Sequence, residues 1–366
     1  MNVFSKKVRT VGSIFIAFFF ITPSLAFALK FKQIVTFGDS LSDHGNLHMY
    51  VTMYPETRTN GDVWVDYLRK ELNADLKNYA VIGAMTSKHL YDDIQKMSDN
   101  EAIPQLGLTD QIDRYIAEGN EFKPSETLFT VWIGANNLIR LGYDIEAKII
   151  ENMDNPDFDL QATTQTMTQD MIVHAMTDMT YAFTTLFNLG VKHIVVLTLP
   201  DIGKAPWYNQ RSEMEIEAAT ALATAFNNSL LSTLDLVTAN YSDVTVYKFD
   251  LFQIMDDVLE KDMFKNETGS YLKLDEAGYI IALTETNGPP EDYLFYDAVH
   301  PMTRAHEYFS TVVAERVIYH GCVTQQELND AVIDERMKWD VKNDNRIGIE
   351  EAIQALKICS GMKPND

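Results

Sequence analysis

The stretch QIVTFGDSLSD, residues 33–43, contains an apolar run of strand length that ends at Gly38, with a serine two positions further on. Four other stretches are equally apolar, and helix-like segments separate them: residues 76–82, 127–133, 193–199 and 244–249. Apolar strands that alternate with helices are typical of a parallel sheet covered on both faces. The sequence therefore predicts an α/β fold with a five-stranded parallel sheet.

Apolar residues also recur at helical spacing between and after these strands. The helices predicted from this spacing are residues 64–72, about 164–188, about 212–238 and a segment after His300. Two irregular stretches, residues 144–160 and 262–290, are expected to be loops, the second beside the functional site. In a parallel sheet, ligands bind beyond the carboxyl ends of the strands, so side chains at those ends carry the functional prediction.

Ser40 follows the first strand and opens a helix-like segment, so its hydroxyl is expected at the carboxyl edge of the sheet. Far along the chain, Asp297 and His300 lie on one turn before the last helix. A serine nucleophile needs a base, and the base needs an acceptor that fixes its tautomer. We therefore interpret Ser40, His300 and Asp297 as nucleophile, base and orienting acid. A helix cap and a local turn bond are the structural alternatives.

Two further strand ends carry hydrogen-bond donors. Gly83 ends the second strand, where a residue without a side chain leaves its N–H open to a ligand. Asn136 follows the third strand and offers a side-chain NH₂ group. With the Ser40 N–H, these groups are enough for an oxyanion hole. Taken singly, a turn glycine and a capping asparagine explain Gly83 and Asn136 equally well.

Six blocks of the sequence resemble, in order, those of the SGNH/GDSL esterase–lipase family, which is named for its Ser, Gly, Asn and His. The blocks are FGDSLSDHGN (37–46), NGDVWVDYL (60–68), NYAVIGA (78–84), VWIGANN (131–137), LPDIG (199–203) and YLFYDAVHP (293–301). The resemblance covers roughly residues 31–320. It is strongest to the branch of bacterial phospholipases A, lysophospholipases, haemolysins and glycerophospholipid–cholesterol acyltransferases.

The resemblance implies a flavodoxin-like three-layer α/β/α fold. It also implies catalysis by Ser40, His300 and Asp297, with Ser40, Gly83 and Asn136 as the oxyanion hole and with no metal or organic cofactor. Two positions depart from the family pattern. Asn137 replaces a common Asp, so the hydrogen bonds that orient Asn136 are expected to differ. His44 replaces a common Thr, and it either faces the site or lies at the surface.

The first 28 residues have the features of a secretory signal peptide: a basic start, an apolar run, and Ala26-Phe27-Ala28 as a cleavage signal. An uncleaved anchor is the alternative, and we expect a secreted or periplasmic protein. Removal of this segment leaves 27 of the 30 basic residues against 53 acidic ones, a net charge of −26. Such a charge excludes nucleic acid and anionic membrane surfaces as partners. Membrane contact would depend on apolar groups or zwitterionic head groups, and no protein partner is indicated.

We expect a hydrolase domain over residues 29–320 and a small helical hairpin over residues 321–366. Cys322 and Cys359, the two cysteines of the chain, lie in this hairpin. Export favours a disulfide between them, with two free thiols as the alternative.

Residues 340–351 resemble an EF-hand or dockerin-type calcium loop. Asp340, Asp344, the Arg346 carbonyl and Glu351 fall at ligand positions. Lys342 and Asn345 depart from the pattern, so calcium binding and a hairpin without calcium are both kept as interpretations.

These features predict a secreted serine ester hydrolase that acts on lipid acyl esters, as a phospholipase A or lysophospholipase, through an acyl-serine intermediate. Transfer of the acyl group to a sterol or another lipid alcohol is a second outcome of the same site. A carbohydrate (acetyl) esterase is the alternative, suggested by the dockerin-like tail. A binding module with an inactive site would require Ser40, His300 or Asp297 to be missing or misplaced, and all three are present.

Overall fold

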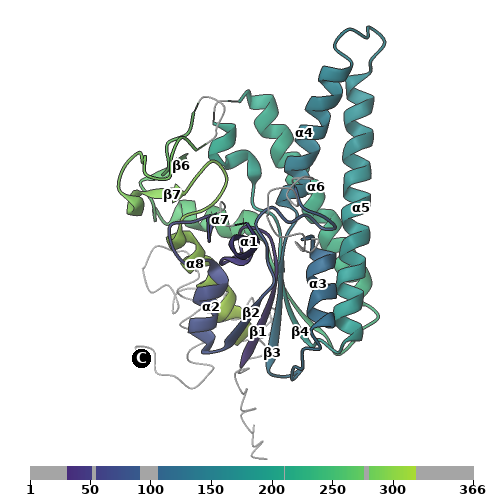
Figure 1. Cartoon of the computed structure of the whole chain (residues 1–366), viewed down its shortest axis with the longest axis vertical. Coiled ribbons are helices and arrows are strands. Elements are labelled where there is room, and N and C mark those ends of the chain that lie inside the picture. Colours follow the sequence, from purple (N-terminus) through teal and green to yellow (C-terminus); the bar gives the residue numbers. More distant parts are fainter. Residues whose placement is uncertain (1–30, 52–54, 91–105, 210, 276–279, 319–366) are drawn as a thin grey trace, which may run out of the picture. The chain divides into compact units, whose positions relative to one another are not determined.

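Five parallel strands form the main sheet of the computed structural model, in the order β2-β1-β3-β4-β5 (Figure 1). They are β1 (Gln33–Gly38), β2 (Asp75–Asn78), β3 (Thr127–Trp132), β4 (His193–Leu197) and β5 (Thr245–Phe249). The structure describes residues 31–51, 55–90, 106–209, 211–275 and 280–318. The predicted five-stranded parallel sheet is confirmed, and its strand order is that of flavodoxin-like folds.

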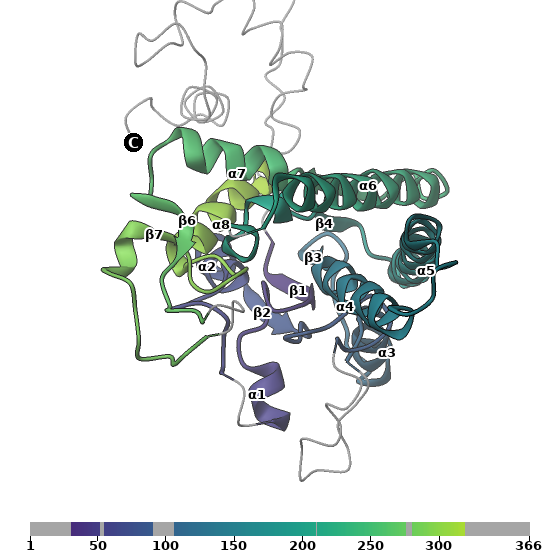
Figure 2. The ribbon, with the colours of Figure 1, turned by 90° about the horizontal axis from the view of Figure 1, so that it is seen from above.

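Helices cover both faces of this sheet (Figure 2). One face carries α3 (Leu108–Ala117), α5 (Leu160–Asn188) and α6 (Glu213–Thr238), and the other carries α2 (Trp64–Leu72), α7 (Leu251–Glu260) and α8 (Thr303–Ile318). Because successive side chains of a strand point to opposite faces, Val35 and Phe37 enter the first core and Ile34 the second. β1 pairs with β2 and β3, so the residues that follow it lie between two other strand ends.

α4 (Ala135–Glu151) and the first part of α5 form a hairpin that projects beyond the carboxyl edge of the sheet (Figure 1). The prediction of an irregular segment over residues 144–160 is wrong up to Glu151, because α4 continues to that residue. Ion pairs at helical spacing support this polar stretch, at 2.8 Å between Arg140 and Asp144 and 2.7 Å between Lys148 and Glu151.

A second, smaller sheet pairs β6 (Asn266–Ser270) with β7 (Tyr293–Phe295) in parallel. The loop predicted over residues 262–290 therefore contains a short strand that its polar sequence does not indicate. β7 leads directly into the turn that carries Asp297 and His300. The remaining short elements are α1 (Asn46–Tyr50) and the 3₁₀ turns Ile202–Lys204, Pro206–Tyr208 and Pro290–Asp292.

Several predictions fall on residues outside the described ranges. They are the signal peptide of residues 1–28 and the C-terminal segment of residues 321–366, with its Cys322–Cys359 disulfide and its calcium ligands Asp340, Asp344, Arg346 and Glu351. Within the described ranges, none of the helices has the length and hydropathy needed to span a bilayer. In the same ranges, no three His, Cys, Asp or Glu side chains are grouped so that they could hold a metal ion.

Candidate active site

Ser40 lies in the turn that follows the carboxyl end of β1. The N–H groups of Ser42 and Asp43 hold this turn by donating to the Asp39 carbonyl, both at 3.0 Å. Gly38 cannot carry a side chain, because a Cβ atom would lie 2.6 Å from the Trp132 carbonyl oxygen on β3. Close pairing of β1 with β3 therefore requires this glycine, and it places the next residues at the carboxyl edge of the sheet.

The structure brings Ser40, His300 and Asp297 into one hydrogen-bonded chain. His300 Nε2 lies 2.8 Å from Ser40 Oγ, and His300 Nδ1 lies 2.8 Å from Asp297 Oδ1. Asp297 also accepts from the backbone N–H groups of Val299 and His300, at 3.0 and 2.9 Å, so the turn itself aims the carboxylate. When Nδ1 donates its proton to Asp297, Nε2 carries the lone pair that can accept the serine proton.

Arg58 is a further member of the site that sequence reasoning misses. Its Nη2 atom lies 3.1 Å from Asp297 Oδ2, and the Asp297 side chain is only 2% exposed. Burial alone would raise the pKa of Asp297, but the neighbouring His300 and Arg58 hold that pKa well below its ordinary value of 3.8. The signal available in the sequence is a basic residue two positions ahead of the NGDVWVDYL block in a strongly acidic chain.

The three predicted oxyanion donors follow three adjacent strands: Ser40 lies in the turn after β1, and Asn136 opens α4 after β3. Gly83 lies in the loop after β2 rather than at the end of that strand, where the sequence predicts it. Within the described part of the chain, the backbone N–H groups of Ser40 and Gly83 donate no hydrogen bond. Asn136 Nδ2 donates to the Ala84 carbonyl at 2.9 Å, which uses one of its two protons. Each of the three groups therefore has an N–H bond that can donate a hydrogen bond to a ligand oxygen.

Gly83 is required by its backbone as well. Its φ of +78° lies in the left-handed region, and a Cβ atom there would be 2.5 Å from His89 Nε2. The buried His89 ring lies across the turn, with Nε2 2.8 Å from the Ile82 carbonyl oxygen. Gly83 is therefore a turn glycine by its backbone conformation. Its N–H, which donates no hydrogen bond among the described residues, can in addition point to a ligand.

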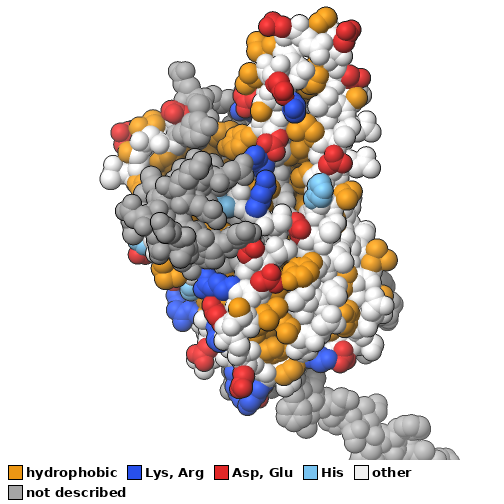
Figure 3. Space-filling model, turned by 45° about the vertical axis from the view of Figure 1, so that its right-hand side comes forward, with side chains coloured by type: hydrophobic (Ala, Val, Ile, Leu, Met, Phe, Trp, Pro, Cys, Tyr) orange, Lys and Arg blue, Asp and Glu red, His pale blue; other side chains and the backbone are white. Residues whose placement is uncertain are grey.

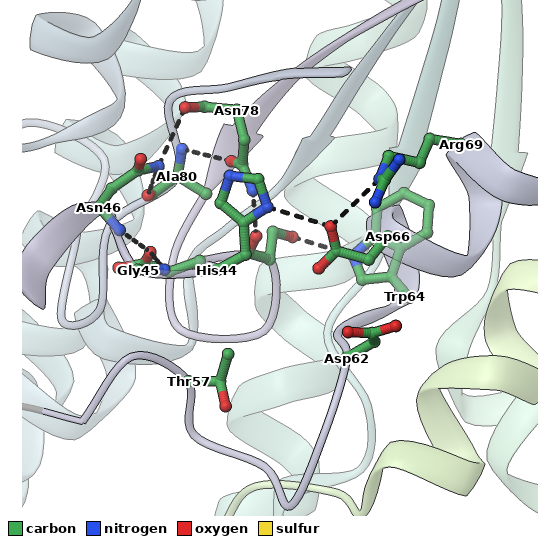
Figure 4. Close-up of polar contacts among 12 residues, drawn as sticks. His44, Gly45, Asn46, Thr57, Asp62, Trp64, Asp66, Arg69, Asn78 and Ala80 are labelled. Atoms are coloured by element: carbon green, nitrogen blue, oxygen red, sulfur yellow. Dashed lines mark hydrogen bonds and ion pairs between the residues drawn. The ribbon is translucent and has the colours of Figure 1, made fainter. Parts of the chain in front are cut away.

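Two asparagines fasten the Ser40 turn to the loop that carries Gly83 (Figure 4). Asn46 Nδ2 donates to the carbonyls of Asn78 and Ala80 at 3.0 and 2.7 Å. Asn78 Nδ2 donates to the Ser42 carbonyl at 2.6 Å. The apolar run predicts a strand to residue 82, but β2 ends at Asn78. Beyond it, the N–H groups of Tyr79 and Val81 still donate to carbonyls of β1, while the Ala80 carbonyl accepts from Asn46.

His44, whose orientation the sequence leaves open, pairs with a neighbouring helix. Its Nδ1 atom lies 3.1 Å from Asp66 Oδ1 on α2, and Arg69 approaches the same carboxylate oxygen at 3.6 Å (Figure 4). The hydrogen bond to Asp66 raises the pKa of His44, against the opposing effect of partial burial. His44 therefore links the Ser40 turn to α2.

Asn137, the other departure from the family pattern, acts as both donor and acceptor toward Thr86. Asn137 Oδ1 accepts from the Thr86 N–H at 3.2 Å, and Asn137 Nδ2 donates to Thr86 Oγ1 at 3.0 Å. The Thr86 hydroxyl donates in turn to Asp178 Oδ2 on α5 at 2.7 Å. An aspartate at position 137 has no proton to give when ionised, so this chain of bonds needs the amide.

Asp39, directly before the nucleophile, is a buried carboxyl group outside the Asp297–His300–Ser40 chain. It is 1% exposed, and its Oδ2 atom has no hydrogen-bond partner among the described residues. Burial raises the pKa of Asp39 to about 7, although the Leu41 N–H bond opposes this. Its protonation therefore changes near neutral pH.

The chain is similar to known proteins across this whole site. A family model described as GDSL-like Lipase/Acylhydrolase matches residues 34–313, which include the three residues of the hydrogen-bonded chain and the three oxyanion donors. The chain is 25% identical over 308 residues to the thermolabile hemolysin of Vibrio parahaemolyticus serotype O3:K6 (strain RIMD 2210633), covering 79% of this chain and 63% of that protein.

Two further relatives are named for different activities. The chain is 27% identical over 231 residues to the phosphatidylcholine-sterol acyltransferase of Aeromonas hydrophila, covering 60% of this chain and 59% of the relative. It is 28% identical over 132 residues to an acetylesterase of Hypocrea jecorina, with coverages of 31% and 37%. The chain thus spans about three fifths of the length of the hemolysin and of the acyltransferase.

Proposed function

The chain belongs to the GDSL-like lipase/acylhydrolase family, and from that premise we propose that it is a serine hydrolase of lipid acyl esters that works through an acyl-serine intermediate. The observation that carries the proposal is the hydrogen-bonded chain from Asp297 through His300 to Ser40 Oγ. A nucleophile, a base and a group that orients the base are the parts that acyl transfer to serine requires.

In the first half-reaction, Ser40 Oγ attacks the ester carbonyl carbon while its proton passes to His300 Nε2. The charge that develops on the carbonyl oxygen is stabilised by the N–H groups of Ser40 and Gly83 and by the Asn136 amide. The intermediate then collapses, the bond to the leaving alcohol breaks, and the imidazolium returns the proton to that alcohol. Asp297, kept ionised by its neighbours, stabilises the imidazolium between these steps.

In the second half-reaction, a water molecule takes the place of the alcohol. His300 removes its proton as it attacks the acyl carbon. The bond from that carbon to Ser40 Oγ then breaks, and the imidazolium returns the proton to Ser40 Oγ. The products are a carboxylic acid and the free serine. A lipid alcohol in place of water would give acyl transfer, and the similarity to the sterol acyltransferase supports this second outcome.

The test is fatty-acid release from phosphatidylcholine and lysophosphatidylcholine by the protein and by its Ser40→Ala variant. Removal of the nucleophile is expected to lower the rate by about 10³-fold or more. Ser229→Ala on α6 is the matched control, because that hydroxyl bonds only within its own exposed helix turn. Equal rates for Ser40→Ala and Ser229→Ala would contradict the proposal.

A carbohydrate acetyl esterase is the second candidate, favoured by the similarity to an acetylesterase. The chemistry at Ser40 would be the same, and the acyl group would be short. Three outcomes can be separated: hydrolysis of lipid esters, acyl transfer to a sterol, and hydrolysis of sugar acetates. The test compares rates on acetylated sugars with rates on long-chain lipid esters, the latter with and without added sterol. Preference for the sugar acetates would replace the lipid proposal, and sterol ester among the products would establish acyl transfer.

A further inference from the structure

Large apolar side chains are exposed at the tip of the α4–α5 hairpin. Ile150, near the end of α4, is 62% exposed, Met153 in the connecting turn is 75% exposed, and Leu160 at the start of α5 is also exposed. Figure 3 shows hydrophobic side chains on this projecting part of the surface, with acidic side chains among them. Single exposed apolar residues are common, but several at one tip mark a contact surface.

Two other segments beyond the carboxyl edge share this property. Met214, 78% exposed, lies in the first turn of α6, which follows β4. Ile281 and Leu283, both exposed, lie between β6 and β7, and β7 leads to Asp297 and His300. Together these exposed side chains form an apolar rim, which consists of Ile150, Met153, Leu160, Met214, Ile281 and Leu283.

The charges at the hairpin tip restrict what can cover the apolar rim. Residues 146–159 contain one basic residue, Lys148, and five acidic ones: Glu146, Glu151, Asp154, Asp157 and Asp159. A second copy of the chain would bring these carboxylates against each other, and anionic lipid head groups would be repelled in the same way. The outward-facing ammonium groups of zwitterionic phospholipids are complementary to them.

We propose that the apolar rim docks the protein on the surface of zwitterionic phospholipid aggregates, with its side chains between the head groups. A projecting tip of Ile, Met and Leu fits a lipid layer, since apolar side chains on a surface helix enter the boundary between head groups and acyl chains. The inference rests on the proposed function, because Ser40 lies at the edge of the sheet from which the rim projects. It identifies aggregated lipid, rather than dissolved ester, as the form of the substrate.

The test measures sedimentation of the full chain with phosphatidylcholine vesicles and with vesicles that also contain phosphatidylglycerol. The Ile150→Ser/Met153→Ser double variant is expected to lose binding by roughly tenfold or more, since each residue contributes apolar area. Ile150→Leu/Met153→Leu should bind like the unaltered chain. Leu236→Ser is the matched control, because Leu236 is 75% exposed at the opposite end of α6 from Met214.

Turnover of a dissolved short-chain ester is measured on every variant and is expected to be unchanged, which also shows that each one is folded. No binding to phosphatidylcholine, equal binding by the double serine variant and Leu236→Ser, or tighter binding to the anionic vesicles would each overturn the inference. So would a dimer in size-exclusion chromatography that the double variant abolishes. If the unaltered chain binds the vesicles but hydrolyses no ester, the proposed function is wrong while the docking surface stands.

Discussion

At the residue scale, Arg58 extends the hydrogen-bonded chain of the site by one member. Its guanidinium holds the oxygen of Asp297 that does not receive the backbone N–H groups of the turn, and it places a positive charge in an otherwise strongly acidic molecule. The carboxylate is therefore fixed from two sides, by its own turn and by a residue about 240 positions away in the chain.

From this contact we expect Arg58→Met to lower kcat with little change in KM for a dissolved ester. A hydrogen bond to a charged group is worth about 1.5–3 kcal/mol, which corresponds to a loss of roughly 10- to 100-fold. Arg58→Lys should recover part of the loss, because an ammonium keeps the charge but not the planar fork. Steady-state kinetics give kcat and KM, and the rate at which an organophosphonate labels Ser40 reports the reactivity of the nucleophile. Unchanged values for Arg58→Met would show that Asp297 does not need its contact with Arg58.

Asp39 gives a second prediction at this scale, on stability. Its pKa in the folded chain, about 7, lies above the ordinary 3.8, so folding favours the protonated form. The contribution of this group to the free energy of unfolding is therefore fully present below about pH 4. It is lost as the pH rises from 4 through 7, and at pH 8 the loss relative to pH 4 and below is about 4 kcal/mol.

Asp39→Asn removes this dependence. Relative to the unaltered chain, the variant is expected to gain about 2–3 kcal/mol in unfolding free energy between pH 5 and pH 8. Urea unfolding at both pH values measures the difference, with Asp75→Asn, an exposed residue of β2, as the control. A difference between Asp39→Asn and the unaltered chain that does not change with pH would show that the buried carboxyl group is not the cause.

At the element scale, the start of α4 is joined to α5 through one threonine. Asn137 donates to the Thr86 hydroxyl, which donates to Asp178. Asn137→Asp would leave two carboxylates that compete for one hydroxyl proton, so we expect a loss of about 1–3 kcal/mol in stability. Thermal melts measure it, and the loss should shrink at acid pH. Asn152→Asp, the same change at the other end of α4, is expected to cost less; equal losses would contradict the explanation.

The elements also show where sequence patterns succeed. Apolar runs locate β1, β3, β4 and β5 to within two residues at each end, because burial on both faces makes most positions of these strands apolar. The same rule makes β2 too long, since the Ala80 carbonyl accepts a hydrogen bond from the Asn46 side chain instead of extending the strand. Helical spacing also indicates α4, since Leu138, Leu141, Ile145 and Ile149 recur on one face of it, so the irregular segment predicted from residue 144 overlooks this period.

At the scale of the whole molecule, the candidate site depends on contacts between distant segments. The order of the motifs predicts that Ser40 and His300 meet, because strand ends converge at one edge of a parallel sheet. It does not predict Arg58, since residue 58 follows no strand and only the folded chain shows its neighbour. The roles of Ser40, His300 and Asp297, and of the three oxyanion donors, stay predictions until the variants are measured.

The C-terminal boundary of the hydrolase domain can be tested by truncation. Residues 29–320 form a compact unit, and the strands, both cores and the site described above lie inside it. We therefore expect a chain of residues 29–320 to fold alone and to hydrolyse a dissolved ester at a rate within about twofold of residues 29–366.

A chain that ends at residue 312 is the control, because it removes Val313 and Val317 of α8, both fully buried in the same core as Trp64 and Phe309. Circular dichroism and kcat/KM on the three chains decide the matter. If residues 29–320 are as inactive as residues 29–312, the segment after His320 belongs to the hydrolase fold. In that case melts in calcium and in chelator, with and without Cys322→Ser, would show whether calcium or a disulfide supplies its contribution.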